Sequence, residues 1–130
     1  MDKIELKKRT KKFAVDIIVF LGQLPYTKAT DIISKQLLRS ATSVGANYRS
    51  ACRGKSAADF INKIIIVEEE ADESVYWLEL LEEASLVNVE LTYPLKKEAN
   101  ELTAIFTSIG KTSKLNQIVL NPKSKFSNSK

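Results

Sequence analysis

The sequence predicts an all-α protein that folds as an antiparallel, up-down-up-down four-helix bundle. Apolar residues recur at three- and four-residue steps along four long segments, which is the period of an amphipathic helix. The 130 residues include four glycines and three prolines, too few for the frequent turns of an all-β protein. A chain of this length is one domain by size and long enough for a single hydrophobic core.

The first helix is expected over about residues 3–24, because its apolar stripe ends at Pro25, which lacks a backbone N–H. The second is expected over about 31–53, with Thr30 or Asp31 as its N-cap. Ala41, Gly45 and Ala46 are small enough to let a neighbouring helix come close. Gly54 follows the last periodic residue and predicts a left-handed C-terminal cap.

The third helix is expected over about 57–86, with Ser56 and Asp59 resembling a capping box. Its start carries three consecutive isoleucines, more apolar surface than one contact needs, which indicates a second buried interface. The fourth helix is expected to begin near Thr92, with Pro94 in its first turn, and to end at Gly110. We therefore predict a bundle over residues 1–111 and a basic, disordered tail over 112–130.

Charge is strongly segregated along the chain. Residues 1–55 hold twelve Lys or Arg against four Asp or Glu, and residues 56–95 hold ten acids against Lys63 alone. Residues 96–130 hold seven lysines against two glutamates. Helices of opposite sign are expected to lie side by side and to leave one basic surface for a partner.

Histidine is absent, which removes Ser-His-Asp and Cys-His catalysis and the usual zinc and di-iron ligand sets. No glycine-rich phosphate loop is present. The acids crowded on the third helix are better explained as a solvated, salt-bridged face than as a metal site. We expect no enzyme activity, cofactor or metal.

Cys52 is the single cysteine, so no intramolecular disulfide is possible, as is usual in a reducing compartment. Although Arg53 could lower its thiol pKa, a small core residue is the expected role. No apolar run follows the N-terminal charges before Asp16, so we expect no signal peptide. No segment is long and apolar enough to span a bilayer, and a cytoplasmic location is expected.

Two basic clusters are candidates for binding nucleic acid. One lies at the start of the first helix and the other near the turn between the second and third helices, where an interleaved tyrosine suits stacking on unpaired bases. The alternative is ordinary surface charge that balances the acidic helix. The candidate residues are Lys3, Lys7, Lys8, Arg9, Lys11, Lys12, Tyr48, Arg49, Arg53 and Lys55.

A polar line follows the second helix beside its apolar stripe, and a matching acidic line follows the third. One interpretation is a ligand-binding or catalytic line. The favoured one is structural: Arg39 pairs with a carboxylate of the third helix, while Ser43 and Asn47 bond across the interface. The residues of this predicted polar seam are Arg39, Ser43, Asn47, Glu68 and Asp72.

Two stretches resemble a known bacterial family. Residues 39–47 carry the pattern R-S-x-x-S-x-x-x-N, and residues 70–81 read EADESVYWLELL. They are similar to four-helix bundle proteins first noticed as open reading frames in intervening sequences of large-subunit ribosomal RNA genes. The resemblance covers about residues 5–112, and its motif positions here are Arg39, Ser40, Ser43, Asn47 and Glu68.

The resemblance implies a ring-like homopentamer, and relatives that serve as accessory subunits of reverse transcriptases in diversity-generating retroelements. We expect a non-enzymatic homo-oligomer that binds structured RNA, or other nucleic acid, through a basic face. The rival is a protein-interaction scaffold for a separately encoded enzyme such as a reverse transcriptase. Its basis is the apolar surface expected at Ile61, Ile64, Ile65, Tyr76 and Trp77.

Overall fold

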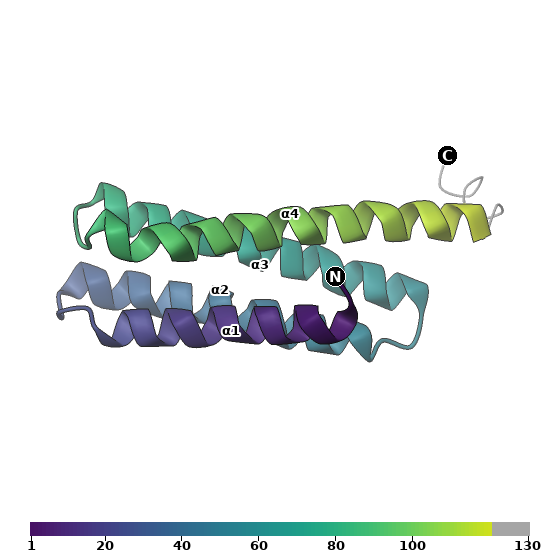
Figure 1. Cartoon of the computed structure of the whole chain (residues 1–130), viewed down its shortest axis with the longest axis horizontal. Helices are drawn as coiled ribbons and strands as arrows, with labels where there is room; N and C mark the ends of the chain where they lie inside the picture. Colours follow the sequence, from purple (N-terminus) through teal and green to yellow (C-terminus); the bar gives the residue numbers. More distant parts are fainter. Residues whose placement is uncertain (121–130) are drawn as a thin grey trace.

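Four α-helices run alternately up and down in the computed structural model, which describes residues 1–120 (Figure 1). They are α1 (Lys3–Gly22), α2 (Lys28–Cys52), α3 (Ala57–Glu83) and α4 (Val89–Leu120). The predicted antiparallel four-helix bundle is confirmed. The turn between α2 and α3 and the N-terminus lie toward the same end, and α4 extends beyond that end (Figure 1).

A side-chain oxygen caps the start of each of the first three helices. Asp2 accepts a hydrogen bond from the N–H of Glu5, Thr27 from that of Thr30, and Ser56 from that of Asp59, at 2.8, 3.0 and 3.1 Å. The predicted cap at Ser56 is confirmed. The cap predicted at Thr30 or Asp31 is wrong, because Thr27 offers the same chemistry one turn earlier.

The turn after α3, rather than the turn after α2, contains the left-handed residue. Ser85 has φ 57°, whereas no glycine among the described residues has a positive φ, so the left-handed cap predicted at Gly54 is wrong. The N–H of Ser85 bonds the carbonyl of Glu82, and that of Leu86 bonds the carbonyl of Leu81, both at 3.0 Å. These are the two bonds of a Schellman motif, with serine where glycine is usual.

Helix α4 is longer at both ends than the sequence predicted. It begins at Val89, where Asn88 accepts a hydrogen bond from the N–H of Glu90 at 2.9 Å, so Pro94 lies inside the helix. The predicted end at Gly110 is wrong: the helix continues to Leu120, and Gly110 is buried facing Ile64. The rest of the predicted tail, 121–130, lies outside the described residues.

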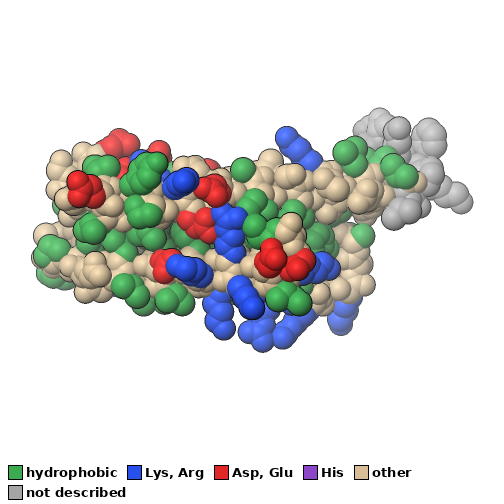
Figure 2. Space-filling model, in the orientation of Figure 1, with side chains coloured by type: hydrophobic (Ala, Val, Ile, Leu, Met, Phe, Trp, Pro, Cys, Tyr) green, Lys and Arg blue, Asp and Glu red, His purple; other side chains and the backbone are tan. Residues whose placement is uncertain are grey.

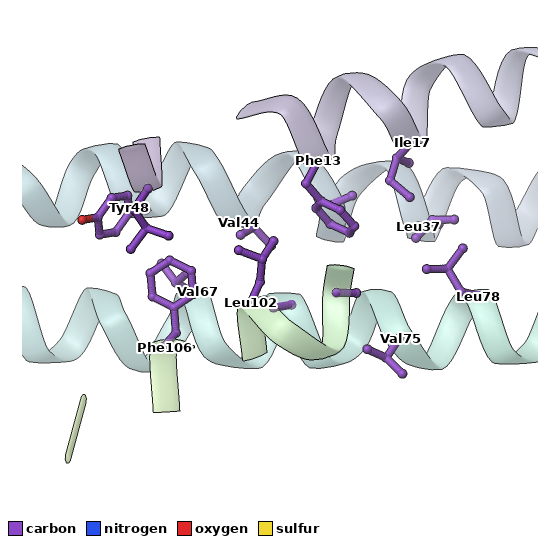
Figure 3. Close-up of a cluster of buried hydrophobic side chains, with 14 of the residues drawn as sticks. Phe13, Ile17, Leu37, Val44, Tyr48, Val67, Val75, Leu78, Leu102 and Phe106 are labelled. Carbon is purple, nitrogen blue, oxygen red and sulfur yellow. The ribbon is translucent and has the colours of Figure 1, made fainter. Parts of the chain in front are cut away.

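The apolar stripes of the four helices meet in one core (Figure 3). Helix α3 packs extensively against both α2 and α4, while α1 packs mainly on α2 and only slightly on α4. A side chain at Gly45 would come within 3.4 Å of the Thr10 backbone, so this glycine permits the close α1–α2 approach expected. The largest fully buried side chains are Phe13, Ile17, Leu37, Ile64, Leu78, Leu81, Leu102 and Phe106.

Two polar contacts lie within the helix interfaces. Ser40 of α2 and Ser74 of α3 are fully buried, with their hydroxyl oxygens 2.9 Å apart. Near the α3–α4 turn, Glu82 accepts hydrogen bonds from Thr92 and from the Lys96 ammonium, the latter at 2.7 Å. Within residues 1–120 no buried side-chain nitrogen or oxygen lacks a hydrogen-bond partner, so burial leaves none of them uncompensated.

Much of the apolar excess predicted at the start of α3 is buried within the bundle. Ile61 and Ile64 belong to the core, Ile65 and Trp77 are half-buried, and Tyr76 is exposed. No helix within residues 1–120 is both long and apolar enough to cross a membrane.

We expect Ser85→Gly to raise the free energy of unfolding by about 0.5–1 kcal/mol. A left-handed residue with a Cβ costs about 1–2 kcal/mol, which the greater freedom of glycine in the unfolded chain offsets in part. Urea unfolding of wild type, Ser85→Gly and Ser85→Ala measures the effect. Ser85→Ala keeps the Cβ and should match wild type, and an equal gain in both variants would contradict the strain at Ser85.

We expect Glu82→Gln to lower the free energy of unfolding at pH 7 by about 1–2 kcal/mol, the size of a charged hydrogen bond. Burial would raise the pKa of the Glu82 carboxyl, but the hydrogen bonds from Lys96 and Thr92 and the Lys96 charge outweigh it, and the net pKa is lowered. The Glu82 carboxylate therefore stabilises fully above the ordinary glutamate pKa and less as pH falls through the lowered value.

The same interaction is lost at alkaline pH, when Lys96 loses its proton. The hydrogen bond to Glu82 raises the pKa of the Lys96 ammonium. Its contribution is full below the ordinary lysine pKa and is lost as pH rises through the raised value. The difference between wild type and Glu82→Gln should thus be constant near neutrality and shrink toward pH 3 in urea unfolding. Glu83→Gln, at the exposed neighbour, is the control, and a difference that persists at pH 3 would refute the ion pair.

Candidate nucleic-acid interface

Two grooves lie on the two flanks of α2 and share Ala46 and Arg49. The groove between α1 and α2 has a volume of about 380 Å³ and is lined by Lys7, Lys8, Lys11, Ala14, Thr42, Gly45, Ala46 and Arg49. The groove between α2 and α3 has a volume of about 650 Å³ and is lined by Ala46, Arg49, Ser50, Arg53, Gly54, Lys55, Asp59, Asn62, Lys63 and Ile66. Residues from three helices thus form one continuous surface.

Cations dominate this surface, which we call the α2 basic surface. Lys and Arg side chains gather along one edge of the molecule, beside the N-terminal half of α1 (Figure 2). Asp59 is the one acid among the residues that line the two grooves, and it lines only the groove between α2 and α3. Within residues 1–120 none of these cations lies within ion-pair distance of a carboxylate. They are Lys7, Lys8, Lys11, Arg49, Arg53, Lys55 and Lys63.

Five other cations of residues 1–120 pair with carboxylates away from this surface. Arg9 of α1 makes hydrogen bonds at 2.7 and 2.6 Å to Glu98 of α4 and at 2.8 Å to Glu101. The Glu98 hydrogen bond, with smaller contributions from Glu101, raises the pKa of the Arg9 guanidinium despite partial burial. Lys12 pairs with Asp16, one turn along α1, at 2.7 Å. Net positive charge is therefore concentrated around α2.

The structure brings together six of the ten residues predicted to bind nucleic acid. They are Lys7, Lys8, Lys11, Arg49, Arg53 and Lys55. Arg9 and Lys12 are engaged with carboxylates and line neither groove. The Lys3 ammonium lies 5.8 Å from the centre of the Phe60 ring, a cation–π distance.

Tyr48 is in the core, which rules out the predicted stacking on bases. Its exposed fraction is 3%, and its ring centre lies 5.2 Å from that of Phe106 (Figure 3). Burial, followed by a hydrogen bond with Cys52, raises the pKa of the Tyr48 hydroxyl. Cys52 is half-buried against the core, consistent with its expected role.

The groove residues missed from the sequence include Asn62 and Lys63 of α3. Lys63 is the one base in the acidic segment 56–95, and it lies just after the turn that holds Lys55. This position could have identified Lys63, because the first turns of an antiparallel helix lie at the same end of the bundle as the last turns of the helix before it.

Arg39 of the polar seam pairs with carboxylates of α3, as predicted, whereas Ser43 and Asn47 do not bond across the interface. Arg39 bonds Glu70 at 2.9 Å and Glu73 at 2.5 Å, and these hydrogen bonds raise the pKa of its guanidinium. Ser43 and Asn47 bond carbonyls of their own helix, those of Arg39 and Ser43.

The acidic residues of the predicted seam lie elsewhere on α3. Glu68 accepts a hydrogen bond from Thr107 of α4 at 2.5 Å, and Asp72 is exposed. Besides the Arg39 ion pairs, a hydrogen bond between Ser40 and Ser74 crosses the α2–α3 interface. In the part of the chain that the structure describes, no cluster of three acidic or cysteine side chains could hold a metal ion.

Exposed apolar residues lie farther along α1, beyond the basic surface. Val15, Ile18 and Val19 are each about half exposed, at 49%, 51% and 55%, and their spacing places them on one face of the helix. Green side chains next to the blue cluster along the same edge mark this region (Figure 2). We call it the α1 apolar strip.

Comparisons with known proteins find a family model and solved structures that match the chain. The family model described as 23S rRNA-intervening sequence protein matches residues 2–108. A crystal structure of a protein of unknown function from the S23 ribosomal protein family of Bacteroides thetaiotaomicron is 38% identical. It superposes with a TM-score of 0.78 and aligns over 85% of this chain and 99% of its own. No curated protein matches the sequence.

We expect Arg9→Gln to lower the free energy of unfolding by about 1–2 kcal/mol, the size of a charged hydrogen bond, because Glu98 and Glu101 lose their cation. The control is Lys12→Gln, which removes the same charge from an exposed pair within α1 and should leave stability unchanged. Urea unfolding at low salt measures both. Equal effects of the two substitutions would show that Arg9 does not hold α1 against α4.

Proposed function

The chain belongs to the 23S rRNA-intervening sequence protein family, and we propose that it binds structured RNA through the α2 basic surface. The role is non-enzymatic and cytoplasmic in this proposal. The grooves are lined mainly by cations, small residues and short polar side chains, a composition suited to phosphate contacts rather than to bond-breaking chemistry.

The carrying observation is the concentration of unpaired cations beside α2. A basic helix that only balanced an acidic one would direct its lysines and arginines at carboxylates. Arg9 and Arg39 do so, whereas the seven cations of the α2 basic surface have no such partner in residues 1–120. Concentrated uncompensated charge attracts a polyanion, and each neutralised phosphate releases counterions.

Self-association through the α1 apolar strip is part of the proposal. Val15, Ile18 and Val19 leave apolar area in water that a second copy would cover. A homo-oligomer, a pentamer by the resemblance, would repeat the basic surface and strengthen RNA binding by raising its effective concentration. DNA is the alternative polyanion, since phosphate contacts alone do not distinguish the two.

The second candidate function is an accessory scaffold for a separately encoded enzyme such as a reverse transcriptase. The observation that favours it is the same α1 apolar strip, which a different protein could cover. The mass of the purified protein in solution separates the two uses of the strip. A stable homo-oligomer favours self-association, whereas a monomer leaves the strip for a different partner.

We expect the double substitution Lys8→Gln and Lys11→Gln to weaken binding to a structured RNA and to flatten its salt dependence. Losing two phosphate contacts should reduce the slope of log K against log salt concentration by about 1.5–2. Fluorescence anisotropy with a labelled RNA hairpin between 50 and 200 mM salt measures both quantities.

The matched control is Lys28→Gln with Lys97→Gln. Both lysines are exposed and line neither groove, so the pair removes the same net charge from outside the α2 basic surface. The control should keep most of the affinity and the wild-type slope. Equal losses in the two double variants would reduce the effect to net charge, and no binding of wild type at 50 mM salt would refute RNA binding.

A further inference from the structure

We infer that the ligand of the α2 basic surface is a double-stranded RNA that receives α2 in its minor groove, an inference that depends on the proposed function. Helix α2 stands between its two grooves as a ridge. Ala46, Arg49, Ser50 and Arg53 are exposed along it, and the cations of α1 and α3 lie on its two sides. A convex ridge flanked by charge complements a concave groove bordered by phosphates.

The cations on both sides of the ridge favour a double-stranded ligand over a single-stranded one. A single strand is usually tracked along one basic groove. Here Lys7, Lys8 and Lys11 lie on one side of α2, and Lys55 and Lys63 on the other. Because a helix with its side chains is about 10–12 Å across, the two sets are too far apart for one phosphate line. They can instead contact the two backbones that border a groove.

The grooves lack the groups that bind unpaired bases. Single-stranded nucleic acid is held by aromatic side chains on which successive bases stack. No Phe, Tyr or Trp lines either groove, and Tyr48, the aromatic residue nearest in sequence to Arg49, is buried in the core. Phosphate contacts without stacking are typical of duplex recognition by shape.

The small residues of the ridge favour A-form RNA over B-form DNA. An A-form duplex has a wide, shallow minor groove lined by 2′-hydroxyls, and proteins read it by shape and by hydroxyl contacts. Ala46 lets the ridge lie close to such a surface. Ser50 and Asn62 supply a hydroxyl and an amide for 2′-hydroxyls, and both are exposed in the groove between α2 and α3.

Competition for the full-length protein tests the inference. The three probes are a 20-base-pair RNA duplex, one strand of that duplex alone, and a DNA duplex of the same sequence, all at equal salt concentration. The sequence is chosen so that the single strand does not fold on itself. We expect the RNA duplex to bind at least about tenfold more tightly than the single strand, and more tightly than the DNA duplex. Equal or tighter binding of the single strand would overturn the inference that the ligand is a duplex. Equal binding of duplex DNA would overturn the inference that the surface fits the A-form groove.

A neutral substitution on the ridge separates shape from charge. Ala46→Gln enlarges the ridge without changing its charge, and Ala104→Gln makes the same change at an exposed position of α4. We expect Ala46→Gln to weaken duplex RNA binding at least about fivefold and to leave the weaker single-strand binding unchanged. Ala104→Gln should match wild type. Unchanged duplex binding by Ala46→Gln would overturn the placement of α2 in the groove.

These outcomes keep the two proposals apart. If the single strand binds as tightly as the duplex and Lys8→Gln with Lys11→Gln weakens both, the α2 basic surface still binds RNA and the duplex inference fails. If wild type binds none of the three probes at low salt, the proposed function itself fails.

Discussion

Burial of the apolar seam of α3 is the constraint on which the other helices depend. Val67, Ala71 and Leu78 have no exposed surface, and α3 packs extensively against both α2 and α4. The acids on its flanks are thereby brought against the neighbouring helices. Glu70 and Glu73 receive Arg39 from α2, and Glu82 receives Lys96 from α4. The hydrophobic seam thus decides which cations of α2 and α4 are neutralised by the acids of α3.

The cations that remain follow from that arrangement. Helix α1 contacts α4 only slightly, and Arg9 supplies the ion pairs of that contact. The lysines on the opposite side of α1 therefore face the flank of α2 where Arg49 lies, and no acid lines the groove between them. The α2 basic surface is positive because the cations of the chain are neutralised unevenly, not because the net charge of the chain is large.

The sequence was enough to predict the fold because each helix carries its own apolar period. Errors arose where two local signals competed. Thr27 and Thr30 are equivalent capping residues three positions apart, and tertiary packing decided between them. Gly110 resembled a helix end, but it is buried facing Ile64 of α3 and the helix continues past it.

The candidate site was predictable in part for a related reason. Charge counts cannot say toward which neighbour a basic residue turns, so Arg9 and Lys8 looked alike although they lie on different sides of α1. Tyr48 already belonged to the apolar stripe of α2, and that pattern was a better guide than its neighbour Arg49. Predicting Lys63 as a groove residue required knowing that the start of α3 lies beside the end of α2.

The extension of α4 beyond the bundle has a consequence for how unfolding is observed. After Gly110 no described side chain is buried, so these last turns are held mainly by propagation from the packed part of the helix. Their ends should fray before the core opens. Far-ultraviolet circular dichroism would register that loss, whereas fluorescence of Trp77, the single tryptophan, reports on packing around α3. The two denaturation curves should therefore diverge at low denaturant and coincide at the main transition.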